Sequence, residues 1–156
     1  MSAGARLAAL VRMLTGVIFI ASGYGKATGP FVKGGFAKSA EQLARDGWPF
    51  WSAFLKSTVL PHAEVFGWIV ALGELAVGIG LLLGFLTRIA AVCGALLLLT
   101  ILLGQSYVPG STWDHWITAG LTTKFALLLL LLIAAIGYAA WGLDGVVRRP
   151  KHVRLR

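Results

Sequence analysis

The stretch "ALGELAVGIGLLLGF", residues 71–85, decides the fold and raises the first question about function. It is apolar except for Glu74, and glycines surround that acid. With its flanks it covers about residues 65–86, close to the roughly 20 residues with which a helix crosses a hydrocarbon core of about 30 Å. A carboxyl group at that depth is costly unless it has a partner or a task. We therefore predict a transmembrane helix whose acid is either paired or functional.

Three further apolar stretches approach or reach the same length. Within lipid the backbone must satisfy its own hydrogen bonds, so each stretch is expected to be a helix. The sequence therefore predicts an all-α fold, a bundle of four transmembrane helices in a single membrane domain over residues 1–156. Only Thr87 and Arg88 separate the second and third helices, which predicts an antiparallel hairpin. The expected spans are about residues 7–25, 65–86, 89–108 and 125–143.

The composition agrees with lipid as the solvent. Hydrophobic residues make up 58% of the chain and charged residues 13%, which is too apolar for a soluble domain of this size. The net charge of +8 could indicate nucleic-acid binding, but the basic residues gather at the ends of the apolar stretches and in the tail. Cations in these places orient a membrane protein, and no basic stripe is interleaved with aromatics. We expect membrane lipid, and no nucleic acid, as a partner.

The placement of lysine and arginine predicts that both termini are cytoplasmic. A basic tail over residues 144–156 then lies inside, and a long loop over residues 26–64 lies outside. Within that loop, Gly47 and Pro49 separate two stretches of mixed apolar and charged residues. These predict short interfacial helices, from about Ser39 to Arg45 and over residues 50–59, that cap the bundle.

Charged and small residues share one face of each of the first two helices. Their spacings of three and four residues place them on single helical stripes. By helical rise, Glu74 lies roughly 14 Å and Arg12 roughly 20 Å below the outer ends of their helices. A guanidinium can reach across such a difference, so we expect the two to meet, because pairing offsets a burial cost of several kcal/mol per ion. The stripes are Arg12, Gly16, Phe19, Gly23 and Lys26 on the first helix, and Gly67, Ala71, Glu74 and Gly78 on the second.

Three interpretations of Glu74 remain open. It forms a structural ion pair with Arg12 or Lys26 that sets the helix register. Alternatively, it lines a cavity where it binds, or exchanges protons with, a small molecule such as a quinone headgroup. In the third interpretation, desolvation keeps the acid protonated without a partner.

Other chemistry has little support in the sequence. His62 and His115 fall in outer loops without ligand spacing, so we predict no metal and no haem. The motif "WDHW" at residues 113–116 is typical of an interfacial anchor. No G-x-S-x-G, phosphate loop or H-E-x-x-H is present to indicate hydrolase or nucleotide chemistry. The single cysteine, Cys93, excludes an intrachain disulfide.

Three segments carry a family resemblance: "LVRMLTGVIFIASGYGKA", "VALGELAVGIGLLLGFLTRIAAVCGALLLL" and "AAWGLDG". With four helices and a long first outer loop, the chain resembles the DoxX/DoxD family of small bacterial membrane proteins. The resemblance implies a multi-pass protein of the bacterial inner membrane. It also implies, through the DoxD branch, a membrane subunit of thiosulfate:quinone oxidoreductase that works with a second subunit. The matching motif positions are Arg12, Gly16, Gly23, Lys26, Gly73, Glu74, Gly78, Gly84, Arg88 and Asp144.

Our leading hypothesis is a membrane subunit of a redox system that holds a quinone near Glu74, Arg12 and Lys26, with Tyr24 and Trp68 as walls. Glu74 would exchange protons with the quinone, and other protein subunits would supply electrons. A rival hypothesis is a non-enzymatic scaffold or accessory subunit, in which the charges only lock the helices. A small-solute transporter with Glu74 as its proton site is a third, although no inverted repeat is visible. The remaining motif residues, Gly16, Gly23, Gly73, Gly78, Gly84, Arg88 and Asp144, are expected to be structural.

Overall fold

The computed structural model describes residues 3–105, 118, 120–136 and 142–144. Every element in this part of the chain is helical, so the predicted all-α fold is confirmed. In chain order the elements are α1 (Ala3–Thr28), η1 (Phe31–Gly35), α2 (Phe36–Asp46), α3 (Pro49–Phe54), η2 (Leu55–Val59), η3 (Leu60–His62), α4 (Ala63–Leu83), α5 (Thr87–Gln105) and α7 (Leu121–Ile136).

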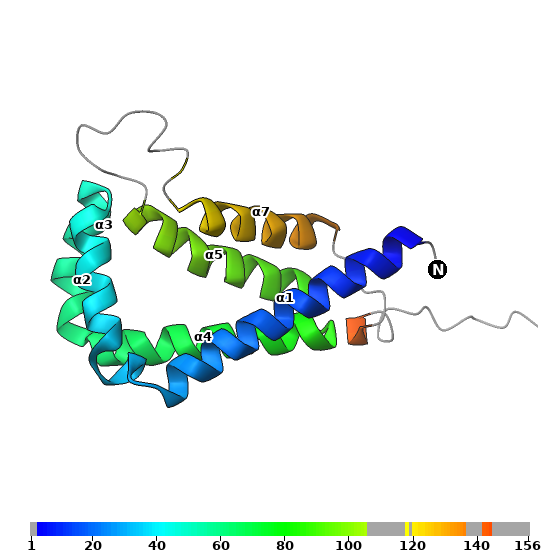
Figure 1. The fold of residues 1–156 in the computed structure, drawn as a ribbon, viewed down its shortest axis with the longest axis horizontal. Helices are drawn as coiled ribbons and strands as arrows, with labels where there is room; N and C mark the ends of the chain where they lie inside the picture. Colours follow the sequence, from blue (N-terminus) through cyan, green and yellow to red (C-terminus); the bar gives the residue numbers. More distant parts are fainter. Residues whose placement is uncertain (1–2, 106–117, 119, 137–141, 145–156) are drawn as a thin grey trace, which may run out of the picture.

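Four apolar helices run along the long axis of the molecule, and α2 and α3 stand across one end of them (Figure 1). Helix α1 packs on α4, α4 on α5, and α5 on α7. Helix α1, the helical run Pro49–Leu83 and α5 are each long and apolar enough to cross a membrane, whereas α7 is a shorter apolar helix. This arrangement confirms a bundle of apolar helices with short helices in its first loop. We call the end covered by α2 and α3 the capped end, and the end with the α4–α5 connection the turn end.

Glycines bring the backbones of α1 and α4 into direct contact. A Cβ atom on Gly16 would lie 2.7 Å from the amide nitrogen of Leu82, and one on Gly23 would lie 2.8 Å from the carbonyl oxygen of Ala71. From the other helix, a Cβ on Gly78 would lie 2.8 Å from the carbonyl oxygen of Gly16. Small residues permit such close helix packing in membranes. These contacts set one antiparallel register for the pair.

Both predicted stripes face this contact or the core beside it. Eight of the nine stripe residues are buried, and the ninth, Lys26, is half-buried, so the predicted faces are confirmed. The ring of Phe19 extends from α1 to Gly94 of α5. There it joins the side chains of Val77 and Leu130 in one buried cluster. The core therefore spans the row of four helices.

Helix α4 ends earlier than predicted because Gly84 adopts a left-handed conformation with φ +63°. The N–H of Phe85 then donates to the carbonyl of Gly80 at 2.9 Å, the hydrogen bond of a Schellman motif. Thr87 and Arg88, predicted as the connection, instead form the first turn of α5. The prediction was wrong because a single glycine stops the helix inside the apolar run.

Asp144 ties the far end of the chain to this turn. Its carboxylate accepts hydrogen bonds from the N–H groups of Leu86 and Thr87, both at 2.9 Å, and so caps the start of α5. Its own N–H donates to the carbonyl of Gly84 at 2.9 Å. The guanidinium of Arg12, 1% exposed, lies against Gly84 and Gly142 and within electrostatic reach of Asp144. Three distant segments therefore meet at the turn end.

The helix bounds differ from the expected ones elsewhere too. Helix α1 is longer than predicted at both ends, and α7 begins at Leu121, four residues before its expected start. Four of the expected features lie outside the described residues: the motif "WDHW" at 113–116, the basic tail at 145–156, the end of the third span at 106–108, and residues 137–141 within the fourth span.

We expect Asp144→Ala to lower the free energy of unfolding by about 2–4 kcal/mol, because it removes a helix cap and the negative charge that acts on the buried Arg12. Chemical unfolding in detergent, followed by circular dichroism, measures the change. Glu41→Ala removes an exposed acid of α2 and should stay within about 0.5 kcal/mol of the wild type. Equal stability of the two variants would contradict the role given to Asp144.

Two glycines of α4 should respond oppositely to alanine. Gly78→Ala should destabilise the protein by about 1–3 kcal/mol, because the new Cβ would lie 2.7 Å from the amide nitrogen of Ile20. At Gly73 the nearest atom is a leucine methyl at 3.6 Å. Gly73→Ala should therefore be neutral or stabilising by up to about 1 kcal/mol through helix propensity. Thermal unfolding of both variants in detergent gives the sign of each effect.

Candidate functional site

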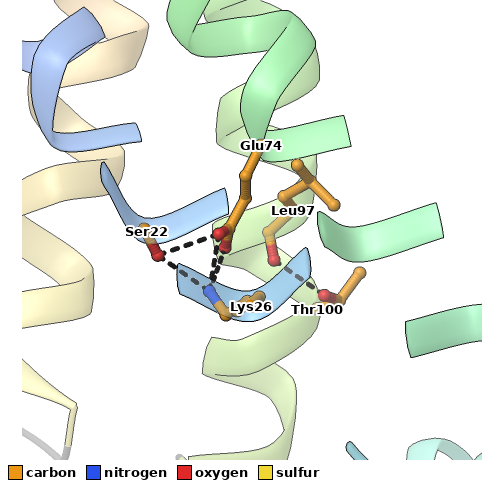
Figure 2. Close-up of polar contacts among 5 residues, drawn as sticks. All are labelled: Ser22, Lys26, Glu74, Leu97 and Thr100. Atoms are coloured by element: carbon orange, nitrogen blue, oxygen red, sulfur yellow. Dashed lines mark hydrogen bonds and ion pairs between the residues drawn. The ribbon is translucent and has the colours of Figure 1, made fainter. Parts of the chain in front are cut away.

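An ion pair joins α1 and α4 near the capped end. Lys26 Nζ lies 2.6 Å from Oε1 and 2.6 Å from Oε2 of Glu74. The Ser22 hydroxyl donates to Oε2 of the same carboxylate at 2.8 Å and accepts from Lys26 Nζ at 2.9 Å. Figure 2 shows Glu74 reaching from α4 to this pair of residues on α1. The acid therefore has a cationic partner, as one interpretation of the sequence required.

The antiparallel packing explains why these side chains meet. Side chains lean toward the N-terminus of their own helix. In α4 that direction runs toward the capped end, and in α1 it runs away from it. Glu74 and Lys26 therefore converge from opposite directions. Ser22 lies one helical turn before Lys26 on the same face.

The structure does not bring Arg12 to Glu74, so the expected pairing of these two residues is wrong. The guanidinium lies at Gly84, ten residues or roughly 15 Å of helix away from Glu74. The register of the two helices explains this: Gly16 lies against Gly78 and Leu82, so Arg12, one turn earlier in α1, is level with Gly84. The expected pairing took the outer ends of the two helices, at residues 25 and 65, as level, whereas Gly23 lies against Ala71 and Leu75.

The two charges of the pair differ in exposure. The Glu74 side chain is 7% exposed, whereas that of Lys26 is 25% exposed. The ammonium group also lies 5.5 Å from the centre of the Phe31 ring, within cation–π range. The pair carries no net charge, so its surroundings favour an uncharged ligand over an ion that would add an uncompensated charge.

The pair forms part of the wall of a cavity of about 670 Å³ between the bundle and the capping helices. This volume is within the range of about 300–1,000 Å³ of small-molecule sites. Most of the wall is apolar and aromatic, with a few polar side chains. Aromatic residues of the wall are Phe31, Phe36, Trp51, Phe54 and Phe66, and polar ones beside the pair are Ser39, Gln42, Asp46, Thr100 and Gln105.

Close contacts with α5 hold the capping helices over this cavity. A Cβ on Gly104 would lie 2.6 Å from Cβ of Leu43 in α2, so the glycine lets α2 approach. At the end of α2, the N–H of Trp48 donates to the carbonyl of Leu103 at 3.2 Å. Inside the cap, Ala40 and Ala44 pack against Leu55 and Val59. The cavity therefore depends on segments far apart in the sequence.

Tyr24 and Trp68, the expected walls, do not line the cavity. Tyr24 is 64% exposed and Trp68 40% exposed. At about 100° per residue, Tyr24 points roughly 160° away from Lys26, and Trp68 points roughly 120° away from Glu74. Of the expected ligand-binding and proton-exchanging residues, the structure places Glu74 and Lys26 together and leaves the others apart.

The sequence predicted neither Ser22 nor the loop aromatics Trp51 and Phe54 as residues of the site. The spacing of four residues between Ser22 and Lys26 could have identified the serine. The positions of Trp51 and Phe54 on the cavity wall could not be read from spacing, because the loop must fold over α4 and α5 to place them there.

The residues that were expected to be structural lie in different parts of the bundle. Gly16, Gly23 and Gly78 form the α1–α4 contact, and Gly84 forms the turn. Arg88 is exposed in the first turn of α5. Within the described residues, no three metal-ligating side chains lie together, and the absence of metal and haem stays a prediction.

Comparison with known proteins supports the resemblance seen in the sequence. A family model described as DoxX matches residues 7–105, which include most of α1 and all of the capping helices, α4 and α5. No curated protein and no solved structure gives a match. The match covers more than half of the chain, and both the ion pair and the cavity lie within it. The chain therefore belongs to the DoxX family, and its apolar helices make it a multi-pass membrane protein.

Proposed function

We propose that this protein is the membrane subunit of a redox system and binds a quinone in the cavity beneath the capping helices. The observation that carries the proposal is the Lys26–Glu74 ion pair in the wall of an otherwise largely apolar cavity. Ligand sites of this kind combine apolar walls with a few placed polar groups. Ionisable side chains at membrane depth are candidates for function.

The residues of the cavity fit a quinone in size and polarity. Aromatic side chains suit a flat ring, and the neutral ion pair suits an uncharged headgroup. A bound quinone would supply the chemistry of accepting two electrons and two protons. A partner protein would provide the electrons, as in the thiosulfate:quinone oxidoreductases to which the DoxD branch belongs.

The chain's own residues would bind the headgroup and handle protons. Lys26 Nζ would donate a hydrogen bond to a ligand oxygen, because a quarter of this side chain is exposed at the cavity. The Glu74 carboxylate would take up a proton from a ligand hydroxyl or return it. Ser22 would hold the carboxylate in place through its hydrogen bond to Oε2. The apolar walls would exclude water from the exchange.

One observation favours a second candidate function, that of a scaffold or accessory subunit. Lys26 and Ser22 already donate to Glu74, so the pair is satisfied within the protein. In this alternative the pair only locks α1 to α4, and the capping helices contact a partner. The two functions differ in whether the purified protein binds a quinone.

Glu74→Gln separates these functions. The amide preserves the shape, so we expect assembly to persist while quinone binding weakens at least about tenfold through loss of the charged partner of Lys26. Mass spectrometry of extracted lipids and calorimetric titration with a short-chain quinone, in lipid nanodiscs, give the measurement. Glu64→Gln is the matched control, because Glu64 is an exposed acid of α4 outside the cavity.

The scaffold alternative predicts the reverse pattern. The wild-type protein would then carry and bind no quinone, and Glu74→Gln would lower the thermal unfolding temperature or impair assembly. A wild-type protein without measurable quinone binding would end the quinone proposal.

The proposal also places both termini in the cytoplasm of a bacterial cell, on the evidence of the lysine and arginine positions. The capped end and its cavity would then face outward, so the electron-donating partner would act from that side. In a Cys93→Ser background, Lys38→Cys on α2 should react with a membrane-impermeant maleimide in intact cells. Arg6→Cys at the start of α1 should react only after permeabilisation. If Arg6→Cys reacts in intact cells and Lys38→Cys reacts only after permeabilisation, the topology is the reverse of the one proposed.

A further inference from the structure

Helices α4 and α5 separate toward the capped end of the bundle (Figure 1). Closer to the turn end they are in contact, because a Cβ atom on Gly73 would lie 3.6 Å from a methyl group of Leu97. One helical turn farther toward the capped end, the antiparallel register brings Val70 opposite Ile101. Both of these residues line the cavity. The cavity therefore begins where the two membrane helices part.

Ile69 marks one edge of the cavity on α4. It belongs to the wall, yet it is 56% exposed. At about 100° per residue, it lies roughly 60° around the helix from the wall residue Phe66 and roughly 60° in the other direction from Leu72. Leu72 is exposed and lies outside the wall. Ile69 is therefore the position at which the wall meets the exposed apolar surface of α4.

Thr100 marks the corresponding edge on α5. It lines the cavity and is exposed. Around the helix it lies between the wall residue Leu97 and Leu96, which is exposed and outside the wall. Its hydroxyl donates to the carbonyl of Leu97 at 2.7 Å, as Figure 2 shows. This donor is satisfied within the helix, so an apolar chain can pass it without leaving it unpaired.

Both edges lie within helices that are long and apolar enough to cross a membrane. By helical rise, Ile69 is roughly 9 Å beyond the start of α4, and Thr100 is roughly 8 Å before the end of α5. The exposed neighbours of these two edges, Leu72 and Leu96, are apolar, as lipid-facing residues are. An opening between the two edges therefore faces hydrocarbon.

The polar groups and this opening lie at different places in the cavity. Lys26 and Glu74 supply the charges, where α1 meets α4. Around α4, Val70 lies between Glu74 and Ile69, and Ile101 lies across from it on α5. The path from the ion pair to the opening is thus apolar. A ligand that fills this path has a hydrogen-bonding ring at one end and a hydrocarbon chain at the other.

We propose that the cavity opens into the membrane between Ile69 and Thr100, and that its ligand is a membrane-dissolved quinone whose hydrocarbon tail passes through this opening. The inference rests on the proposed function and specifies the class of ligand, a ring with a long apolar tail that enters from the lipid. Ile69 and Thr100 are then specificity residues for the tail, while the Lys26–Glu74 pair contacts the headgroup.

The binding test uses two probes with the same benzoquinone ring, one without a tail and one with a decyl chain. Ile69→Trp places a bulkier side chain in the opening. It should raise the dissociation constant of the decyl probe at least about tenfold and leave that of the tail-less probe within about twofold of the wild type. Leu72→Trp, on the exposed surface of the same helix, is the matched control and should change neither value. Both probes are titrated in lipid nanodiscs, and empty nanodiscs correct for partition into the lipid.

A nitroxide label at position 100 tests where the opening leads. The label is attached to Thr100→Cys in a Cys93→Ser background, and electron paramagnetic resonance measures its collisions with oxygen and with a water-soluble nickel chelate. Oxygen concentrates in lipid, so we expect frequent collisions with oxygen and few with the chelate. The decyl probe should reduce the collisions with oxygen, whereas the tail-less probe should not. A label on Leu96→Cys, outside the wall, should respond to neither probe.

The contrary outcomes distinguish this inference from the proposed function. An equal loss of affinity for both probes in Ile69→Trp, or no loss for either, removes the tail path and leaves the quinone site standing. Frequent collisions of the position-100 label with the nickel chelate assign the opening to water and overturn the entry from lipid. A wild-type protein that binds neither probe removes both this inference and the proposed function.

Discussion

The direct backbone contact between α1 and α4 controls the positions of the chain's buried charges. Gly16, Gly23 and Gly78 permit this contact, and each leaves no room for a side chain. In lipid, where apolar surface gains little from leaving its solvent, close packing of small residues is a main source of helix association. The contact sets one antiparallel register. That register puts Lys26 beside Glu74 near one end and Arg12 beside Gly84 at the other.

Arg12 and Lys26 therefore have different surroundings, although both lie on the same stripe of α1. At the turn end, Arg12 is almost fully buried, and Asp144 caps α5 and binds the α4–α5 turn. These contacts hold three segments of backbone together. At the capped end, the Lys26–Glu74 pair borders a cavity, and part of the lysine is exposed there. The first arrangement is suited to stability, whereas the second is suited to contact with a ligand.

The cavity exists because the capping helices fold across the end of the bundle. Helix α2 reaches α5 at Gly104, and α3 presents Trp51 and Phe54 to the same space. The loop thus contributes aromatic walls, while the bundle contributes the charges. A ligand with an apolar ring and hydrogen-bonding oxygens matches both contributions. This division supports the proposed quinone.

The sequence by itself determined the helical class, the membrane setting, the buried stripes and the need of Glu74 for a partner. These follow from local patterns, because the length of an apolar run and the spacing of small residues act within one helix. The tertiary structure alone decided which cation meets Glu74, where α4 stops and which aromatics face the cavity. Partner choice depends on the antiparallel register and on the lean of each side chain, and neither is visible within a single helix. The cavity depends on contacts between α2 and α5, which lie far apart in the chain and meet only after the loop has folded over the bundle.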